Sequence, residues 1–250
     1  MLRSFASGTV FGAATGDEAP WLLALHGWRR THADFARVLA GPPVLDALAL
    51  DLPGFGASPL PPSPWGSADY AAAIAPVLEE MAAQRGGPVV VLGHSFGGRV
   101  ALQLAERFSE LVAALVLTGV PLLPPAGGAP RPARGYRLAR WAHRRGLLSD
   151  ERFEAKRLQY GSEDLRGTPA ALRPTFVRLV NERYDGQFPQ LRLPVVLVWG
   201  ALDDVVPLEV AERAVGLLPD ARLECCAGVG HMVPLERPDA LRSAVLGLRP

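Results

Sequence analysis

The chain has 250 residues, of which 49% are hydrophobic, so it is long and apolar enough to bury a core and is not intrinsically disordered. The formal net charge of +1 gives no electrostatic reason to expect a nucleic-acid partner. The N-terminal 20 residues lack the apolar run of a signal peptide, and no apolar run approaches the ~20 residues of a membrane span. The two cysteines are adjacent, at Cys225 and Cys226, which implies no disulfide framework. We therefore expect a cytoplasmic protein without a membrane partner.

The first half of the chain alternates short, continuously apolar runs with helical patterns. Such runs are typical of strands that are buried on both faces of a parallel sheet. Thr31 is a candidate N-cap, and Pro76 implies a kink or a break in its helix. The predicted elements are strands at 10–12, 21–25, 47–50, 89–92 and 111–117, a turn at 15–18, and helices at 31–39, 67–83 and after residue 95.

The alternation stops at Pro121, where a segment rich in proline and glycine begins. Residues 136–184 have helical patterns, and Arg134, Arg137, Arg140 and Arg144 form one charged stripe that we interpret as a solvated face. The sheet resumes with strands at 194–199 and 223–226, and with helices at 208–217 and after residue 238. We predict an α/β fold: a mostly parallel central sheet with helices on both faces, a core of residues 1–120 and 193–250, and a helical cap of residues 121–192.

Ser95 lies at the apex of a predicted strand–turn–helix unit. Residues 93–97 read G-x-S-x-G, the pattern of a nucleophile elbow. Glycines on either side of the serine let strand and helix pack closely around a tight turn, which holds the hydroxyl clear of the backbone. The helix that follows directs its free N–H groups toward the same place, where they favour negative charge. We therefore predict that Ser95 is a nucleophile.

A nucleophilic serine needs a base and an acid that orients the base. In an α/β sheet these groups lie on loops at the carboxyl ends of strands. The strand at 194–199 is followed by Asp203 and Asp204, and the strand at 223–226 is followed by His231. The chain order is thus serine, aspartate, histidine, with two adjacent candidates for the acid.

These motifs resemble the α/β-hydrolase family, in its small, capped serine-hydrolase branch. The matching pieces occur in the family's order and spacing over nearly the whole chain except the cap, which would follow the sixth strand. They are His26-Gly27-Trp28, residues 51–58, residues 93–98, Gly200-Ala201-Leu202-Asp203 and Gly228-Val229-Gly230-His231.

The resemblance implies a role for each matching residue. Ser95 would be the nucleophile, His231 the general base and acid, and Asp203 rather than Asp204 the residue that orients the histidine. The backbone N–H groups of Phe96 and Trp28 would form the oxyanion hole. The resemblance implies no cofactor, and no cluster of residues has the spacing of metal ligands.

The remaining histidines and the cap residues have simpler interpretations. We expect His26 to support the oxyanion loop, His94 to pack beside the elbow, and His32 and His143 to be solvated or to lie in the cap. A pocket for a small apolar substrate would be formed by cap residues, with the aromatic side chains Tyr136, Trp141, Phe153, Tyr160 and Phe176 as candidates.

The predicted activity is hydrolysis of a small carboxylic ester through an acyl-enzyme on Ser95. A serine nucleophile argues against haloalkane dehalogenases and epoxide hydrolases of this fold, which use aspartate, and against dienelactone hydrolases, which use cysteine. C–C bond hydrolases often have tryptophan after the catalytic histidine, where this chain has Met232. A C–C hydrolase, a lyase or a cofactor-free haloperoxidase-like enzyme stays as an alternative. A small-molecule receptor that retains the triad is an alternative from a different class of function. The sequence predicts neither the oligomeric state nor the identity of the substrate.

Overall fold

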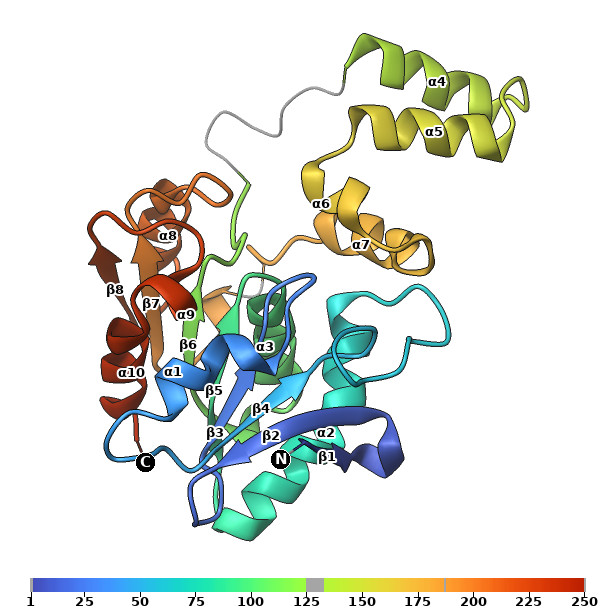
Figure 1. The fold of residues 1–250 in the computed structure, drawn as a ribbon. Coiled ribbons are helices and arrows are strands. Elements are labelled where there is room, and N and C mark those ends of the chain that lie inside the picture. The colour runs from blue at the N-terminus through green and yellow to red at the C-terminus, as the bar shows by residue number, and fades with distance from the viewer. Residues whose placement is uncertain (1, 125–132, 187, 250) are drawn as a thin grey trace.

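A computed structural model describes residues 2–124, 133–186 and 188–249 (Figure 1). Eight strands form one sheet in the order β1-β2-β4-β3-β5-β6-β7-β8. The strands are β1 (Leu2–Phe5), β2 (Val10–Thr15), β3 (Leu22–Leu25), β4 (Ala47–Asp51), β5 (Val89–His94), β6 (Val112–Thr118), β7 (Val195–Gly200) and β8 (Ala221–Cys226). Pairing from β4 through β3 to β8 is parallel, and β1 and β2 are antiparallel at one edge. The predicted mostly parallel sheet is confirmed.

Helices cover both faces of this sheet, also as predicted. Helices α2, α3 and α8 pack into one apolar layer, and α1 and α10 pack into the other. The helices are α1 (Ala36–Leu39), α2 (Ser67–Arg85), α3 (Phe96–Arg107), α4 (Arg134–Arg144), α5 (Asp150–Tyr160), α6 (Glu163–Gly167), α7 (Arg173–Val180), α8 (Leu208–Val215), α9 (Val233–Glu236) and α10 (Pro238–Leu246). Strands β3 to β7 are almost wholly buried, because each is apolar on both of its faces.

Several local predictions need correction. The strand predicted at 10–12 is the second strand, because β1 precedes it. Thr31 does cap a helix, but residues 32–35 form a 3₁₀ turn before the short helix α1. Helix α2 continues through Pro76 to Arg85, so the helix is not broken there.

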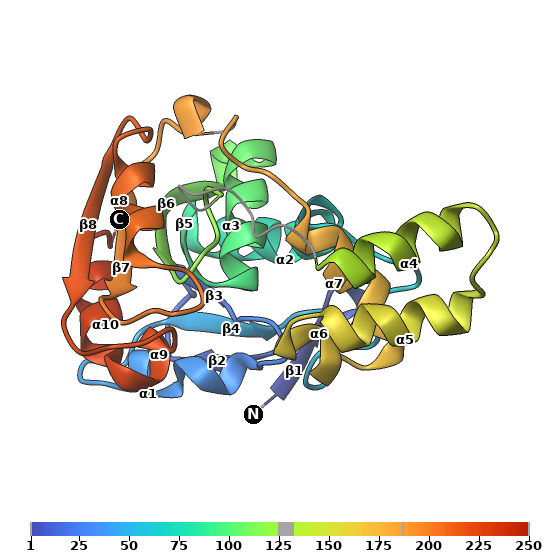
Figure 2. The same ribbon diagram turned by 90° about the horizontal axis from the view of Figure 1, so that it is seen from above.

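Helices α4 to α7 lie between β6 and β7 in the chain, and we call residues 133–186 the insertion. Helices α4 and α5 form a hairpin that projects away from the sheet, whereas α6 and α7 lie closer to it (Figures 1 and 2). Residues 125–132, part of the segment rich in proline and glycine, lie outside the described residues. The four arginines of the predicted stripe are exposed on α4.

Candidate active site

Ser95 occupies a strained turn between β5 and α3. Its backbone has φ 48° and ψ −109°, a conformation that is costly for a residue with a side chain. The turn is held because the Ser95 N–H donates to the Thr118 carbonyl at 2.9 Å. A Cβ at Gly97 would collide with the Leu25 carbonyl oxygen, and one at Gly93 would lie 2.5 Å from the Gly98 Cα. Only glycine fits at either position, so the G-x-S-x-G pattern follows from the close approach of strand and helix.

His231 and Asp203 are brought together from loops after β8 and β7. The Nδ1 of His231 donates to Oδ2 of Asp203 at 2.8 Å, which leaves Nε2 of a neutral ring free to accept a proton. The other carboxylate oxygen of Asp203 accepts the N–H groups of Val205 and Val206 at 2.9 and 2.8 Å. The Asp203 side chain is fully buried, whereas that of His231 is 15% exposed. Asp203 thus fixes the orientation of an imidazole whose other edge is accessible.

Asp204, the competing candidate for the acid, is exposed and has no hydrogen bond to His231 within the described residues.

The structure also shows a close approach of Gly119 to His231 that the sequence motifs do not reveal. A Cβ at Gly119, where φ is +59°, would lie 2.7 Å from Cε1 and 2.9 Å from Nδ1 of His231. Gly119 follows β6 directly and has no side chain, so its backbone forms one wall of the space around the His231 ring.

The backbone N–H groups of Trp28 and Phe96 are available to a substrate oxygen. Phe96 is the first residue of α3 and has no intrahelical acceptor for its N–H. In the part of the chain that the structure describes, neither N–H donates to a protein acceptor. The two side chains meet edge to face at 5.2 Å between ring centroids, which places the two loops side by side. Ser95 and Trp28 line the same two cavities, and Phe96 lines one of them.

His26 supports the loop that carries Trp28. Its Nε2 accepts the Leu52 N–H at 2.9 Å, so its Nδ1 carries the proton that is donated to the Gly27 carbonyl at 2.7 Å. Burial lowers the pKa of His26 to about 4, so the ring stays neutral. This agrees with the predicted supporting role of His26.

His32 is not merely solvated, as the sequence suggests, but is bonded to the buried carboxylate of Asp51. Both the backbone N–H and Nδ1 of His32 donate to Oδ1 of Asp51, at 2.9 and 2.8 Å, and the Ala57 N–H donates to Oδ2. Burial alone would raise the pKa of Asp51, but these hydrogen bonds outweigh it and hold the pKa below its ordinary value. The interaction connects the 3₁₀ turn after β3 to the last residue of β4. No sequence motif points to it, because its partners are 19 residues apart.

Two cavities meet at Ser95. One, of about 280 Å³, is lined by Ser95 and His231 and by the polar side chains Arg29, Arg30 and Asp164. The other, of about 150 Å³, lies on the Phe96 side and is lined by apolar residues that include Phe176, Leu179 and Val206, and by Arg99 and Asp164. The two cavities adjoin, since Trp28, Ser95, Asp164 and Val205 line both.

Of the five aromatic residues predicted to line the pocket, only Phe176 does so within the described residues. Tyr136, Phe153 and Tyr160 pack against one another in the α4–α5 hairpin, and Trp141 is half exposed there under Arg145. The helical pattern of the sequence does not distinguish aromatic residues that pack between α4 and α5 from Phe176, which faces the cavity at Ser95.

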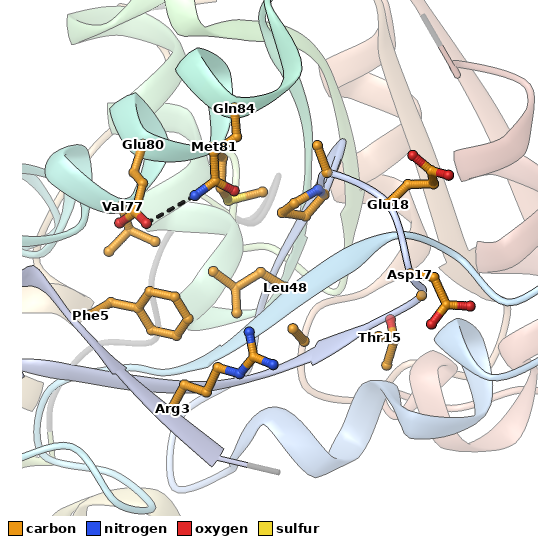
Figure 3. A pocket seen from close by; sticks show the side chains of 14 residues that line it. Arg3, Phe5, Thr15, Asp17, Glu18, Leu48, Val77, Glu80, Met81 and Gln84 are labelled. Atoms are coloured by element: carbon orange, nitrogen blue, oxygen red, sulfur yellow. Dashed lines mark hydrogen bonds between the residues drawn. The ribbon is translucent and has the colours of Figure 1, made fainter.

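A larger cavity, of about 520 Å³, lies elsewhere, between β1, β2 and α2 (Figure 3). Its polar side chains include Arg3, Asp17 and Glu18, and the Gln84 amide donates to Glu80 at 3.0 Å. No histidine, serine or cysteine lines it, so it offers no nucleophile and base pair. The site at Ser95 is the smaller but chemically equipped one.

Within residues 2–124, 133–186 and 188–249, no three histidine, cysteine, aspartate or glutamate side chains are arranged to hold a metal ion. In the same ranges, no helix combines the length and the apolarity required to cross a bilayer. Both cysteines are free thiols.

The sequence model of the alpha/beta hydrolase family matches residues 22–244. The chain belongs to the alpha/beta hydrolase family. This match includes every residue of the site described above, from Trp28 to His231.

Individual relatives of this family differ in the reactions that their names record. The chain is 27% identical, over 95% of its length and 89% of that protein, to a 2-hydroxy-6-oxononadienedioate/2-hydroxy-6-oxononatrienedioate hydrolase of a Pseudomonas species. It is 41% identical over 96 residues, 38% of this chain and 35% of that protein, to the lipase LipV of Mycobacterium tuberculosis. An esterase from Exiguobacterium antarcticum shares the fold with a TM-score of 0.73 and 19% identity, over 100% of this chain and 99% of that one. The family is shared by ester and C–C hydrolases.

Proposed function

We propose that this protein is a serine hydrolase that cleaves a small carboxylic ester through an acyl-enzyme on Ser95. The observation that carries the proposal is the hydrogen bond from His231 to the buried Asp203, beside the cavity that His231 shares with Ser95. A buried carboxylate fixes the ring tautomer, so that Nε2 is the free base. The strained Ser95 turn places the hydroxyl in the same cavity.

In the proposed reaction, His231 Nε2 takes the proton of the Ser95 hydroxyl as its oxygen attacks the ester carbonyl carbon. The N–H groups of Trp28 and Phe96 stabilise the oxyanion, and each such donor contributes about 3–4 kcal/mol where it has been measured in other enzymes. His231 then gives the proton to the departing alkoxide. Water, deprotonated by His231, attacks the acyl carbonyl and releases the acid, and His231 returns the proton to the Ser95 oxygen.

We assign the two cavities from the position of His231. The leaving group must lie beside the histidine that protonates it. In this proposal it therefore occupies the polar cavity of about 280 Å³, which His231 lines. The acyl group then occupies the apolar cavity of about 150 Å³ on the Phe96 side, which we call the acyl cavity. We propose that the insertion acts as a cap, because Phe176 and Leu179 of α7 form part of the acyl cavity wall.

C–C bond hydrolysis is the second candidate, because the Pseudomonas relative that matches 95% of the chain is a hydrolase of a 2-hydroxy-6-oxo dienedioate. Both reactions would use Ser95 and His231. The two candidate functions are distinguished by comparing the turnover of a p-nitrophenyl ester with the turnover of a 2-hydroxy-6-oxo dienedioate. An ester hydrolase turns over the first much faster than the second.

The test uses a series of p-nitrophenyl esters with wild type, Ser95→Ala and His231→Ala. We expect both variants to lose activity by about 10⁴-fold or more while they stay folded. Ser243→Ala is the matched control, because Ser243 is exposed on α10 and lies outside the site. A fluorophosphonate should label wild type but not Ser95→Ala. If wild type neither hydrolyses any ester nor is labelled, the proposal is wrong.

A further inference from the structure

Arg99 is a buried cation in the wall of the acyl cavity. It lies one turn after Ser95 in α3, is 8% exposed, and lines the same cavity as Ser95 and Phe96. Within the described residues, no carboxylate oxygen lies within 4.0 Å of its guanidinium. The remaining residues, 1, 125–132, 187 and 250, include no aspartate or glutamate. No acidic side chain of this chain therefore forms an ion pair with Arg99.

The protein partners of Arg99 are neutral. One terminal nitrogen donates to the Leu179 carbonyl at 2.8 Å and to the Tyr184 hydroxyl at 3.3 Å, and the guanidinium lies 5.3 Å from the Tyr184 ring centroid. Burial raises the pKa of Tyr184 to about 12, so its hydroxyl stays protonated and brings no negative charge. A guanidinium has five N–H donors in a planar fork that matches a carboxylate. Within the described residues, neither Nε nor the other terminal nitrogen of Arg99 donates to a protein acceptor.

Glu182 is connected to Arg99 through the Tyr184 hydroxyl, without a direct ion pair to Arg99 within the described residues. It accepts the Tyr184 hydroxyl at 2.5 Å and the Ser67 N–H at 2.9 Å. A buried charge is normally paired, since its removal from water is costly. Asp164 also lines this cavity, but its ion-pair partner is Arg29 at 4.0 Å and not Arg99. A buried cation without an ion pair therefore suggests that its anion arrives with the substrate.

We propose that Arg99 binds a carboxylate at the far end of the substrate's acyl group. The substrate class would be esters of short dicarboxylic acids, such as succinyl or glutaryl esters. The inference rests on the proposed function, because it takes the Phe96 side of Ser95 as the acyl side. A cavity of about 150 Å³ suits a short chain, since a protein cavity of roughly this volume holds a benzene molecule.

A purely structural role would also use Arg99, because its bond to the Leu179 carbonyl fastens α7 to α3. The two roles differ in substrate dependence. Loss of the bond between Arg99 and the Leu179 carbonyl would lower activity toward every ester. Loss of a partner for the substrate carboxylate would lower activity only toward the ester that carries a carboxylate.

The experiment compares p-nitrophenyl glutarate, which ends in a free carboxylate, with p-nitrophenyl pentanoate, which has the same chain length without charge. We expect wild type to prefer the glutarate ester in kcat/KM by about 10- to 100-fold, the range for hydrogen bonds to charged groups. Arg99→Gln should abolish the preference, mainly through KM, and Arg99→Lys should restore part of it. Arg107→Gln, exposed on the last turn of the same helix, is the matched control and should keep the wild-type ratio.

Three outcomes would overturn the inference or locate a failure elsewhere. Equal turnover of both esters by wild type, dependent on Ser95, overturns the inference but leaves the proposed function intact. An equal loss toward both esters in Arg99→Gln assigns Arg99 a structural role and also overturns it. If neither ester is cleaved and fluorophosphonate does not label Ser95, the proposed function itself fails.

Calorimetry with free glutarate tests the inference without turnover. Ser95→Ala protein should bind glutarate, and Ser95→Ala combined with Arg99→Lys should bind it more weakly. Absence of glutarate binding to Ser95→Ala contradicts the inference. This measurement also covers the case in which Arg99→Gln fails to fold, because the lysine retains the positive charge.

Discussion

The Nε2 of His94 donates a hydrogen bond to the carbonyl oxygen of His231 at 3.1 Å. The two rings are 5.0 Å apart between centroids, and the bond connects the residue before the nucleophile to the residue that is proposed as its base. His94 was expected only to pack beside the elbow. It also fixes the backbone of the histidine loop relative to strand β5.

This bond determines the protonation state of His94. A carbonyl can only accept, so Nε2 carries the proton and the buried Nδ1 has none, with no protein partner in the described residues. A second proton would have to be placed on this buried nitrogen, and burial lowers the pKa of His94 to about 3. His26 is neutral for the same reason, with its pKa lowered to about 4.

We predict that the protein loses stability when the pH falls below about 6.5, because of His26 and His94. In the unfolded chain each imidazole takes up a proton near pH 6.5, whereas in the folded protein each stays neutral until about pH 4 or 3. Their stabilising contribution is therefore complete above pH 6.5 and decreases toward pH 4, with a slope of roughly 2–3 kcal/mol per pH unit at most. Urea unfolding between pH 4.5 and 7.5 measures this slope.

His94→Gln separates this contribution from that of other groups. The glutamine amide reaches the position of Nε2 and can donate to the His231 carbonyl, but it does not titrate, so we expect the variant to reduce proton uptake on unfolding by about one per molecule. An unchanged pH slope in this variant would contradict the prediction.

Asp203→Asn should lower kcat by about 10⁴-fold, because an amide cannot hold the histidine in the same tautomer and charge state. Asp204→Asn is a closely matched control, as it makes the same chemical change at the next residue, which is exposed. Steady-state kinetics of the two variants side by side provide the measurement. Similar losses in both would show that the site does not depend on the Asp203–His231 bond.

Gly119→Ala should displace the His231 ring, because the new Cβ would lie 2.7 Å from its Cε1. We expect a decrease in kcat of about 100-fold, the order of magnitude for a small misplacement of a catalytic group. Gly86→Ala is the control for backbone strain, since Gly86 also has a positive φ but no neighbour within 4 Å of the added Cβ. If the two variants lose the same activity, the contact with His231 is unimportant.

Phe176→Ala should enlarge the acyl cavity and shift the preference toward longer acyl chains, with a change in relative kcat/KM of about tenfold. Trp141→Ala removes an aromatic residue of similar size from the projecting α4–α5 hairpin and should leave the chain-length profile as it is. Kinetics over the p-nitrophenyl ester series measure both profiles. A shift caused by Trp141→Ala instead would mean that the hairpin contributes to the pocket.

The parts of the fold that could be predicted from the sequence are those in which one stretch of chain determines its own conformation. Continuous apolar runs identify strands β3 to β7, and the glycines beside Ser95 identify the turn. Asp203 and His231 could be located because each follows a strand directly. Strand β1 was missed because its residues are mostly exposed at the sheet edge, so it has no apolar run.

Contacts between distant segments could not be predicted in this way. The bond between His32 and Asp51, the Gly119 wall against His231 and the buried position of Arg99 each depend on how separate loops and helices pack. A helical period shows which residues share a face but not what that face meets. For this reason the aromatic residues of the insertion were assigned to the pocket when most of them hold α4 and α5 together.

The indole N–H of Trp28 donates to the Thr168 hydroxyl at 2.8 Å. This bond connects the loop after β3 to the insertion, and its donor is a fluorescent side chain. Its ring is also in contact with Phe55, Phe96 and Phe176. Any separation of the insertion from the core would expose this indole to water and remove its hydrogen-bond acceptor. Trp28 is one of five tryptophans, so in a variant that keeps only this one, the emission spectrum would follow the position of the insertion without an added label.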